Sequence, residues 1–290
     1  MPRNFSLPGR VYLIGAGPGR ADLLTLRAFE ILRRADVVLH DDLVFSEVLQ
    51  VIPASAVVLN VGKRCGNKKF AQEQIHERMT AEARQGRTVV RLKGGDPLIF
   101  GRAQEEMQAL RQAGIEFEVV PGITAALAAA AAAQIPLTER RSASKLLFVS
   151  NHQCDKKVLH NWRSNVVSDT TLVFYMPGRE FSELVEDLRE GGLAPETPCL
   201  LVSNATLPHQ ELIRTTLSEL SATLAPPAPS LLIVGSMVAE GASTARQGTP
   251  GFEEILTLDE NRKGLELDRK DAAATRGEEA SGETNPAMTA

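Results

Sequence analysis

A strand that runs into a glycine-rich loop, between residues 88 and 102, is the feature that most constrains the fold of this chain. The β-branched run Thr88-Val89-Val90 predicts a strand. The sequence Gly94-Gly95-Asp96-Pro97 that follows predicts a tight loop, because glycine gives the backbone freedom and proline fixes φ. Open α/β sheets bind ligands at the carboxyl edge of their strands, where such a loop lies. Taken alone, however, Gly, Asp and Pro are ordinary turn residues, and the loop favours a structural turn.

Strands and helices alternate through the first half of the chain, which predicts an α/β fold with a parallel sheet. Two further glycine loops, Gly15-Ala16-Gly17-Pro18-Gly19 and Pro121-Gly122, also directly follow expected strands. Three loops at one sheet edge indicate a pocket more strongly than any of them alone. The expected strands cover residues 9–14, 37–39, 57–61, 88–92 and 116–120, and expected helices follow the first loop and cover residues 72–85.

A dinucleotide-binding fold is disfavoured by the first loop. The fingerprint Gly-x-Gly-x-x-Gly needs a third glycine where this chain has Arg20. Pro18 would also remove one of the backbone donors that hold a pyrophosphate.

The second half of the chain also has an α/β pattern. Thr124 is placed to cap a helix over residues 125–133 that is almost wholly alanine, and the Arg- and Ser-rich segment after it predicts a hinge. We expect further strands at residues 146–150, 171–176, 199–203 and 231–234, with helices near 181–190 and 216–224. The expected organisation is a flexible N-terminus (1–8), an N-terminal α/β domain (9–138), a C-terminal α/β domain (139–240) and a disordered tail (241–290).

Composition excludes several classes of protein. A net charge of −4 argues against a general nucleic-acid binder. The three cysteines form no CxxC pair, which favours a reducing cytoplasm, and the five histidines lack metal-ligand spacing, so we expect no metal. The longest apolar run, residues 123–133, falls short of the ~20 residues that a membrane span needs. We expect neither a membrane segment nor a secretory signal.

Four segments, taken in order, resemble the uroporphyrinogen-III C-methyltransferases of the tetrapyrrole methylase family. The resemblance covers roughly residues 9 to 240. The segments are Gly15-Ala16-Gly17-Pro18-Gly19, Gly62-Lys63-Arg64-Cys65-Gly66, the block from Thr88 to Arg102, and Val119-Val120-Pro121-Gly122-Ile123-Thr124.

The resemblance implies two α/β domains with the active site in a cleft between them, and a homodimer. It implies S-adenosylmethionine as methyl donor, with S-adenosylhomocysteine as product. The implied reaction is methylation of uroporphyrinogen III at C2 and C7 to precorrin-2, for sirohaem or cobalamin synthesis. The implied cofactor contacts are Pro18, Gly94, Gly95, Asp96, Ile99, Thr124, Ala125, Met176 and Ala205.

Asp41 and Lys63 match the family positions proposed as proton acceptor and proton donor. Methyl transfer to a pyrrole carbon builds positive charge and requires a later proton loss, which a nearby carboxylate assists. From the residues alone, capping of the next helix by Asp41 or Asp42 is an equally good interpretation, and Met176 equally fits a core methionine at a strand end.

The substrate carries acetate and propionate groups on each ring, so cations are expected around it. We expect Arg64, Arg91 and Arg102 to bind these carboxylates, with Arg140 and Arg141 as further candidates.

Several positions depart from the family pattern and concern substrate handling more than cofactor binding. Ala205 replaces a glycine, and its methyl group would either crowd the cofactor or sit on a backbone that accepts alanine. Two alternatives therefore stay open: a different precorrin or cobalt-precorrin C-methyltransferase, and a non-catalytic protein that binds S-adenosylmethionine. The other departures are Arg20, Asn67-Lys68-Lys69, Ala103-Gln104 and Glu139-Arg140-Arg141.

Overall fold

The computed structural model describes residues 9–64, 67–68, 71–151, 165–166 and 169–240. All of them fall within one compact unit of the chain. The expected flexible N-terminus and disordered tail lie outside the described residues, as do Cys65 and Cys154.

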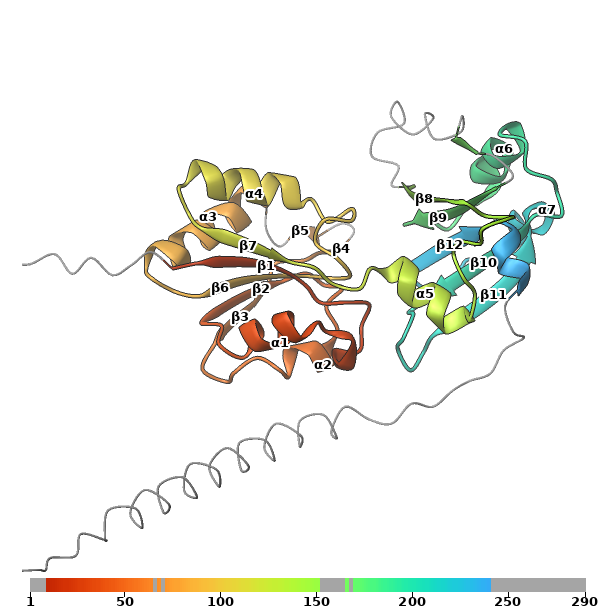
Figure 1. Cartoon of the computed structure of the whole chain (residues 1–290). Coiled ribbons are helices and arrows are strands. Elements are labelled where there is room, and N and C mark those ends of the chain that lie inside the picture. The colour runs from red at the N-terminus through yellow and green to blue at the C-terminus, as the bar shows by residue number, and fades with distance from the viewer. Residues whose placement is uncertain (1–8, 65–66, 69–70, 152–164, 167–168, 241–290) are drawn as a thin grey trace, which may run out of the picture. The chain divides into compact units, whose positions relative to one another are not determined.

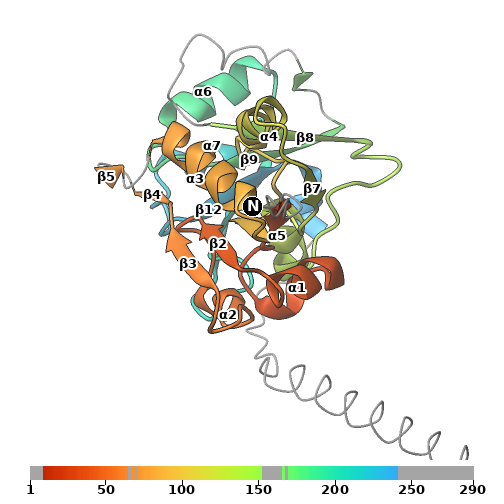
Figure 2. The ribbon, with the colours of Figure 1, turned by 90° about the vertical axis from the view of Figure 1, so that its left-hand side faces the viewer.

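The first sheet has five parallel strands in the order β3-β2-β6-β1-β7 (Figure 1). Helices α3 and α4 cover one face and α1 and α2 the other, as Figures 1 and 2 both show. Side chains of α3 and α4, including Ile75, Met79 and Leu110, pack on the sheet in one buried cluster. The strands are β1 (Val11–Gly15), β2 (Val37–His40), β3 (Val57–Asn60), β6 (Val89–Lys93) and β7 (Phe117–Val120); the helices are α1 (Leu26–Leu32), α2 (Ser46–Leu49), α3 (Gln72–Arg84) and α4 (Ala103–Gln112).

Strand β6 lies at the centre of this sheet and is buried along its whole length, although it contains two cations. Arg91 and Lys93 are each 3% exposed. Because a buried charge must be paired, these side chains indicate carboxylates inside the structure.

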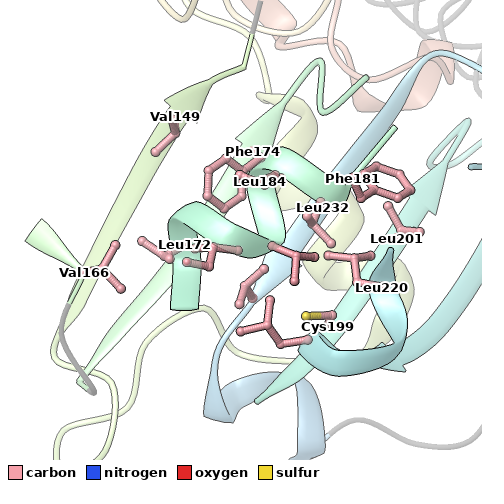
Figure 3. Close-up of a cluster of buried hydrophobic side chains, with 14 residues drawn as sticks. Val149, Val166, Leu172, Phe174, Phe181, Leu184, Cys199, Leu201, Leu220 and Leu232 are labelled. Carbon is pink, nitrogen blue, oxygen red and sulfur yellow. The ribbon is translucent and has the colours of Figure 1, made fainter. Parts of the chain in front are cut away.

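The second sheet is mixed, in the order β11-β10-β12-β9-β8. Only β8 and β9 pair in parallel, and the other neighbours are antiparallel. One face carries a core around Phe174, Phe181 and Leu232, drawn in Figure 3, to which α6 and α7 contribute. The strands are β8 (Lys145–Ser150), β9 (Thr170–Tyr175), β10 (Pro198–Ser203), β11 (Glu211–Thr216) and β12 (Ser230–Val234); the helices are α6 (Ser182–Glu190) and α7 (Leu217–Leu220).

The alanine-rich helix α5 (Ala125–Ala133) packs on the opposite face of this second sheet. Its buried alanines share a cluster with Val173, Leu200 and Ile233, whose neighbours in sequence point into the other core. The small side chains permit close packing of helix on sheet. The α5 helix therefore joins the second sheet by its contacts, while a domain boundary near residue 138 stays a prediction.

The expected fold class is confirmed, with two sheets and flanking helices. The expected strands form within one residue of the expected limits, except that β1 begins at Val11 and not at residue 9, and α5 covers the expected residues. Helix α7 is shorter than expected. Helix α4, strand β11 and the two-residue strands β4 (Lys63–Arg64) and β5 (Asn67–Lys68) were not expected. In the part of the chain that the structure describes, no helix combines the length and apolar character needed to cross a bilayer.

Candidate active site

The three glycine loops meet backbone to backbone at the carboxyl edge of the first sheet. Gly17 N donates to Gly95 O at 3.1 Å, and Gly95 N donates to Gly17 O at 2.8 Å. A Cβ on Gly15 would lie 2.5 Å from Gly95 O, and one on Gly122 would lie 2.3 Å from the same atom. Only glycine fits at positions 15 and 122 without moving the backbone. The prediction that the loops converge is therefore confirmed.

Asp96 ties two of these loops together. Its Oδ1 accepts from Leu98 N at 2.8 Å, within its own loop, and its Oδ2 accepts from Gly122 N at 3.0 Å, in the loop after β7. A carboxylate that accepts two backbone N–H groups is held firmly in place. Asp96 thus has a structural partner on each oxygen and also lines the adjoining cavity.

A cavity of about 230 Å³ lies beside these loops. Its wall includes every residue expected to contact the cofactor, and Asp41 lies in the same wall. Strands β9, β10 and β12 of the second sheet contribute to the wall through Tyr175, Val202 and Leu231. The expected residues that it brings together are Pro18, Gly94, Gly95, Asp96, Ile99, Thr124, Ala125, Met176 and Ala205.

Several non-glycine residues in the cavity wall have a left-handed backbone. The φ angles are +52° at Phe100, +52° at Met176 and +48° at Asn204. This conformation costs an L-residue about 1–2 kcal/mol. Met176 is 45% exposed, which excludes the interpretation of Met176 as a core methionine.

Ala205 has no such strain. It lines the cavity, but the described residues with positive φ do not include it. The sequence left two interpretations open, a methyl group that crowds the cofactor and a backbone that accepts alanine. The φ angle favours the second.

Tyr175 connects the wall of the cavity to the start of helix α5. Its hydroxyl is 2.6 Å from Thr124 Oγ1 and accepts from Ala126 N at 3.3 Å. Thr124 occupies the N-cap position, as expected, but its hydroxyl contacts Tyr175 instead of a backbone N–H of the helix. The Tyr175 ring also packs against Phe100 at a centroid distance of 5.0 Å. Burial raises the pKa of Tyr175, so the hydroxyl stays protonated at neutral pH.

Asp41 belongs to a group of four charged side chains at the edge of the cavity. Arg91 Nη2 donates to Asp41 Oδ1 at 2.5 Å, and Arg91 Nε donates to Glu106 Oε1 at 2.8 Å. Lys93 Nζ lies 3.1 Å from Glu106 Oε1 and 3.9 Å from Asp41 Oδ2. Glu106, on helix α4, is fully buried and Gln72 contacts the same oxygen at 3.4 Å. Two cations thus face two anions, and all of these side chains except that of Asp41 are almost completely buried.

The pKa of Lys93 and the pKa of Arg91 are shifted in opposite directions. Burial, reinforced by the charge of Arg91, lowers the pKa of Lys93 below its ordinary value of 10.5. For Arg91 the burial effect is outweighed by Asp41 and Glu106, and the pKa is raised. Arg91 is therefore charged at all working pH values, whereas Lys93 loses its proton more readily than an exposed lysine.

The expected substrate-binding arginines Arg91 and Arg102 lie in different environments, one buried and one exposed. Arg91 is 3% exposed and fully engaged by Asp41, Glu106 and the carbonyl oxygens of Leu39 and Leu92. It is not placed to bind substrate, because a substrate carboxylate cannot reach it without displacing these partners. The expectation for Arg91 is therefore corrected to a role inside the protein.

Arg102 is exposed and forms a two-pronged pair with Glu105, with N–O distances of 2.8 and 2.6 Å. The strand β4 contains the backbones of Lys63 and Arg64, but their side chains lie outside what the structure describes. The expected roles of Lys63, Arg64 and Arg102 stay predictions. No group of three or more potential metal ligands occurs among the described residues.

Lys93, Glu106 and Tyr175 were not expected at the site. A signal was present for the first two, because Arg91 and Lys93 alternate within a strand that also contains Val89, Val90 and Leu92. Charges in so apolar a strand need buried partners. Nothing comparable in the sequence indicates Tyr175.

Comparison with known proteins identifies the family. The family of Tetrapyrrole (Corrin/Porphyrin) Methylases matches residues 10–221, and the chain belongs to this family. The chain is 45% identical over 235 residues to "Uroporphyrinogen-III C-methyltransferase" of Paracoccus denitrificans, covering 80% of this chain and 82% of that protein. It is 44% identical to "Siroheme synthase" of Baumannia cicadellinicola, covering 79% of this chain and 50% of that protein. The chain thus spans about half the length of the first curated relatives that it matches.

Solved structures give the same family. Uroporphyrin-III C-methyl transferase from Thermus thermophilus, complexed with S-adenyl homocysteine, is 35% identical with a TM-score of 0.68, over 81% of this chain and 96% of that one. A cobalt precorrin-4 methyltransferase is 27% identical with a TM-score of 0.71, over 82% of this chain and 98% of that one.

Proposed function

We propose that this chain is a uroporphyrinogen-III C-methyltransferase, which transfers methyl groups from S-adenosylmethionine to C2 and C7 of uroporphyrinogen III and yields precorrin-2 for sirohaem or cobalamin synthesis. The observation that carries the proposal is that every expected cofactor residue and Asp41 line the same cavity. The likeness to the Paracoccus and Thermus proteins supports the same substrate.

The cavity suits S-adenosylmethionine in its chemistry. Gly94 and Gly95 bring bare backbone to the cavity wall, and Ala125 and Ala205 add only a methyl group each, which leaves room for a ligand. Asp96 adds a carboxylate, and Thr124 and Tyr175 add hydroxyl groups to an otherwise apolar wall that includes Ile99 and Met176. We therefore assign the cofactor to these residues. When bound, S-adenosylmethionine supplies an electrophilic methyl group on a sulfonium sulfur.

Asp41 is assigned to the proton that leaves the substrate. An attacking pyrrole carbon leaves the ring positively charged, and a carboxylate close by stabilises that charge and then accepts the proton. Asp41 directly follows β2, its side chain is 30% exposed, and Arg91 orients it. Lys63 is kept as the proposed proton donor from the resemblance.

Arg64 and Arg102 are proposed to bind the acetate and propionate groups of the substrate. Arg102 is exposed at the start of α4, directly after Gly101 in the cavity wall, and Glu105 is its present partner. A substrate carboxylate would compete with Glu105 for the guanidinium. The resemblance further predicts a homodimer, and the cysteine usage a cytoplasmic location.

The test is an anaerobic assay with the purified protein, S-adenosylmethionine and uroporphyrinogen III, followed by absorbance and by mass. We expect two methyl groups to be added. Addition of one would mean that the departures from the family pattern limit the reaction. No addition, with S-adenosylhomocysteine still bound in calorimetry, would favour the non-catalytic alternative.

The likeness to a cobalt precorrin-4 methyltransferase favours one second candidate, a C-methyltransferase for a later macrocycle. The same assay with a precorrin in place of uroporphyrinogen III separates the two. A higher kcat/KM for the precorrin would replace the proposed substrate.

A further inference from the structure

The group of charges beside the cavity contains one ammonium group to which the proposed reaction assigns no task. Lys93 is the last residue of β6 and comes directly before Gly94 in the glycine loop. It is 3% exposed, yet it forms part of the cavity wall. A buried ammonium group is costly unless it is paired, and Lys93 faces a carboxylate on either side.

We propose that Lys93 is a positioning residue for Asp41: fixed by Glu106, its ammonium group and the guanidinium of Arg91 together hold the Asp41 carboxylate at the cavity wall with Oδ2 turned to the substrate. This inference rests on the proposed function of Asp41 as proton acceptor.

The distances give the two cations different tasks. Arg91 Nη2 is bonded to Asp41 Oδ1 at 2.5 Å and occupies that oxygen. Lys93 Nζ, at 3.9 Å from Oδ2, is too far for a hydrogen bond but close enough for a strong charge interaction. Among the described residues Oδ2 has no hydrogen bond, so it is the oxygen that can take a proton.

Glu106 fixes both cations in these places. It is fully buried and accepts from Arg91 Nε at 2.8 Å and from Lys93 Nζ at 3.1 Å. The Lys93 stem is confined as well, since a Cβ on Gly101 would lie 3.1 Å from Lys93 Cε. Glu106 thus holds Arg91 in its bond to Asp41 and holds the Lys93 ammonium group beside the second oxygen of Asp41.

The surroundings of Lys93 also predict how it responds to pH. The charged groups around it are Arg91 on its own strand, Glu106 from α4 and Asp41 from the end of β2. Gln72 of α3 contacts Glu106 and His76. His40, at the end of β2, has its Nδ1 3.0 Å from the backbone oxygen of Asp41. Burial and Arg91 lower the pKa of Lys93, so as the pH rises the ammonium group loses its proton earlier than an exposed lysine does. Asp41 then loses one of its two cations, and the rate falls.

The first experiment compares Lys93→Met and Lys93→Arg with the matched surface control Lys145→Met. Lys145 is exposed and pairs with Asp169. We expect Lys93→Met to lower kcat about tenfold or more, with the Kd for S-adenosylhomocysteine changed less than about threefold. Lys93→Arg should restore part of kcat and move the alkaline limb of the kcat profile to higher pH, because arginine does not titrate there.

A wild-type kcat and an unchanged alkaline limb in Lys93→Met would overturn the inference. Where Lys93→Met fails to fold in a thermal unfolding experiment, the Lys93→Arg profile decides, since an alkaline limb at the wild-type pH would equally overturn it.

The second experiment needs no enzymatic activity. The Lys93 titration is followed by NMR of protein labelled with 13C-lysine, with the signal assigned by its loss in Lys93→Arg. Because Lys93 and Asp41 interact, Asp41→Asn should lower the titration midpoint of Lys93. Glu106→Gln, as a single variant, should lower the midpoint more than Asp41→Asn does. An unchanged midpoint in Asp41→Asn refutes the inference even where uroporphyrinogen III is not the substrate. A lowered midpoint in a protein without this activity would instead refute the proposed function alone.

Discussion

Arg91 Nη2 donates a hydrogen bond of 2.5 Å to Asp41 Oδ1, and this pair joins the centre of the first sheet to the cavity wall. Arg91 is 3% exposed, whereas the Asp41 side chain is 30% exposed. The pair therefore presents one carboxylate to the cavity from a rigid and buried base. Asp41 does not cap the next helix, because the N-cap residue of α2 is Phe45.

Asp41→Asn should slow methyl transfer by about 10²–10⁴-fold, because the amide keeps the shape of the side chain but cannot take the proton. The Kd for S-adenosylhomocysteine, measured by calorimetry, should stay close to that of the wild type. Parallel loss of rate and of cofactor binding would mean that Asp41 has a structural role only.

Asp96→Ala should weaken S-adenosylhomocysteine binding about tenfold, because the Leu98 and Gly122 N–H groups lose their common acceptor and the two loops separate. Asp96→Asn keeps one acceptor oxygen and should lose less. Calorimetry gives both affinities, and circular dichroism checks that the fold is kept. The control is Asp169→Ala, an exposed carboxylate outside the cavity wall. Equal affinities for Asp96→Ala and wild type would remove Asp96 from the proposed cofactor site.

Gly122→Ala should destabilise the protein by about 1–3 kcal/mol or prevent folding, because the new Cβ would lie 2.3 Å from Gly95 O. Gly114→Ala is a matched control. A Cβ there meets nothing within 4 Å, and only the strain of φ +67°, about 1 kcal/mol, is expected. Urea unfolding measures both. A smaller loss for Gly122→Ala than for Gly114→Ala would contradict the close contact of the loops.

Ala205→Gly should change the Kd for S-adenosylhomocysteine by less than about threefold and lower the free energy of unfolding by about 0.5–1 kcal/mol. The reason is that alanine at this position has no positive φ to relieve, while glycine has more freedom to lose on folding. Calorimetry and urea unfolding give the two quantities. Much tighter binding in the glycine variant would show instead that the methyl group crowds the cofactor.

Cys199 should resist alkylation by iodoacetamide at pH 8 in the folded protein and react after unfolding. Burial raises the pKa of its thiol from 9.0 to about 12, so almost no thiolate is present. The unfolded thiol ionises first, and this group's contribution to stability is accordingly lost as the pH rises from 9 toward 12. Peptide mass spectrometry quantifies the labelling, with Cys199→Ser as control. Equal labelling of folded and unfolded protein would contradict the burial of the thiol.

The strands and the converging loops could be predicted from sequence because their signals are local. β-Branched runs define the strands, and glycine directly after a strand defines the loops. Helix α4 and strand β11 were not expected, since Ala103–Gln112 has few large apolar residues and Glu211–Thr216 is a partly exposed edge strand.

The roles of the charged residues depend on contacts between distant parts of the chain. Arg91 could be predicted to bind an anion, but not that the anions are Asp41 and Glu106, 50 and 15 residues away. Likewise, Tyr175 meets Thr124 across 51 residues. Such pairings follow from the order of strands in the sheets, which the sequence pattern does not specify.

The left-handed backbones of Phe100, Met176 and Asn204 place backbone strain in the wall of the cavity. Glycine would relax Phe100 and Met176 by about 1 kcal/mol or more and Asn204 by less, because asparagine tolerates this conformation, and it would delete a side chain from the cavity wall. Selection for heat resistance and selection for catalysis therefore pull these three positions in opposite directions. A thermostability screen carried out without a test of activity would tend to select glycine at these three positions and so remove their side chains from the cavity wall.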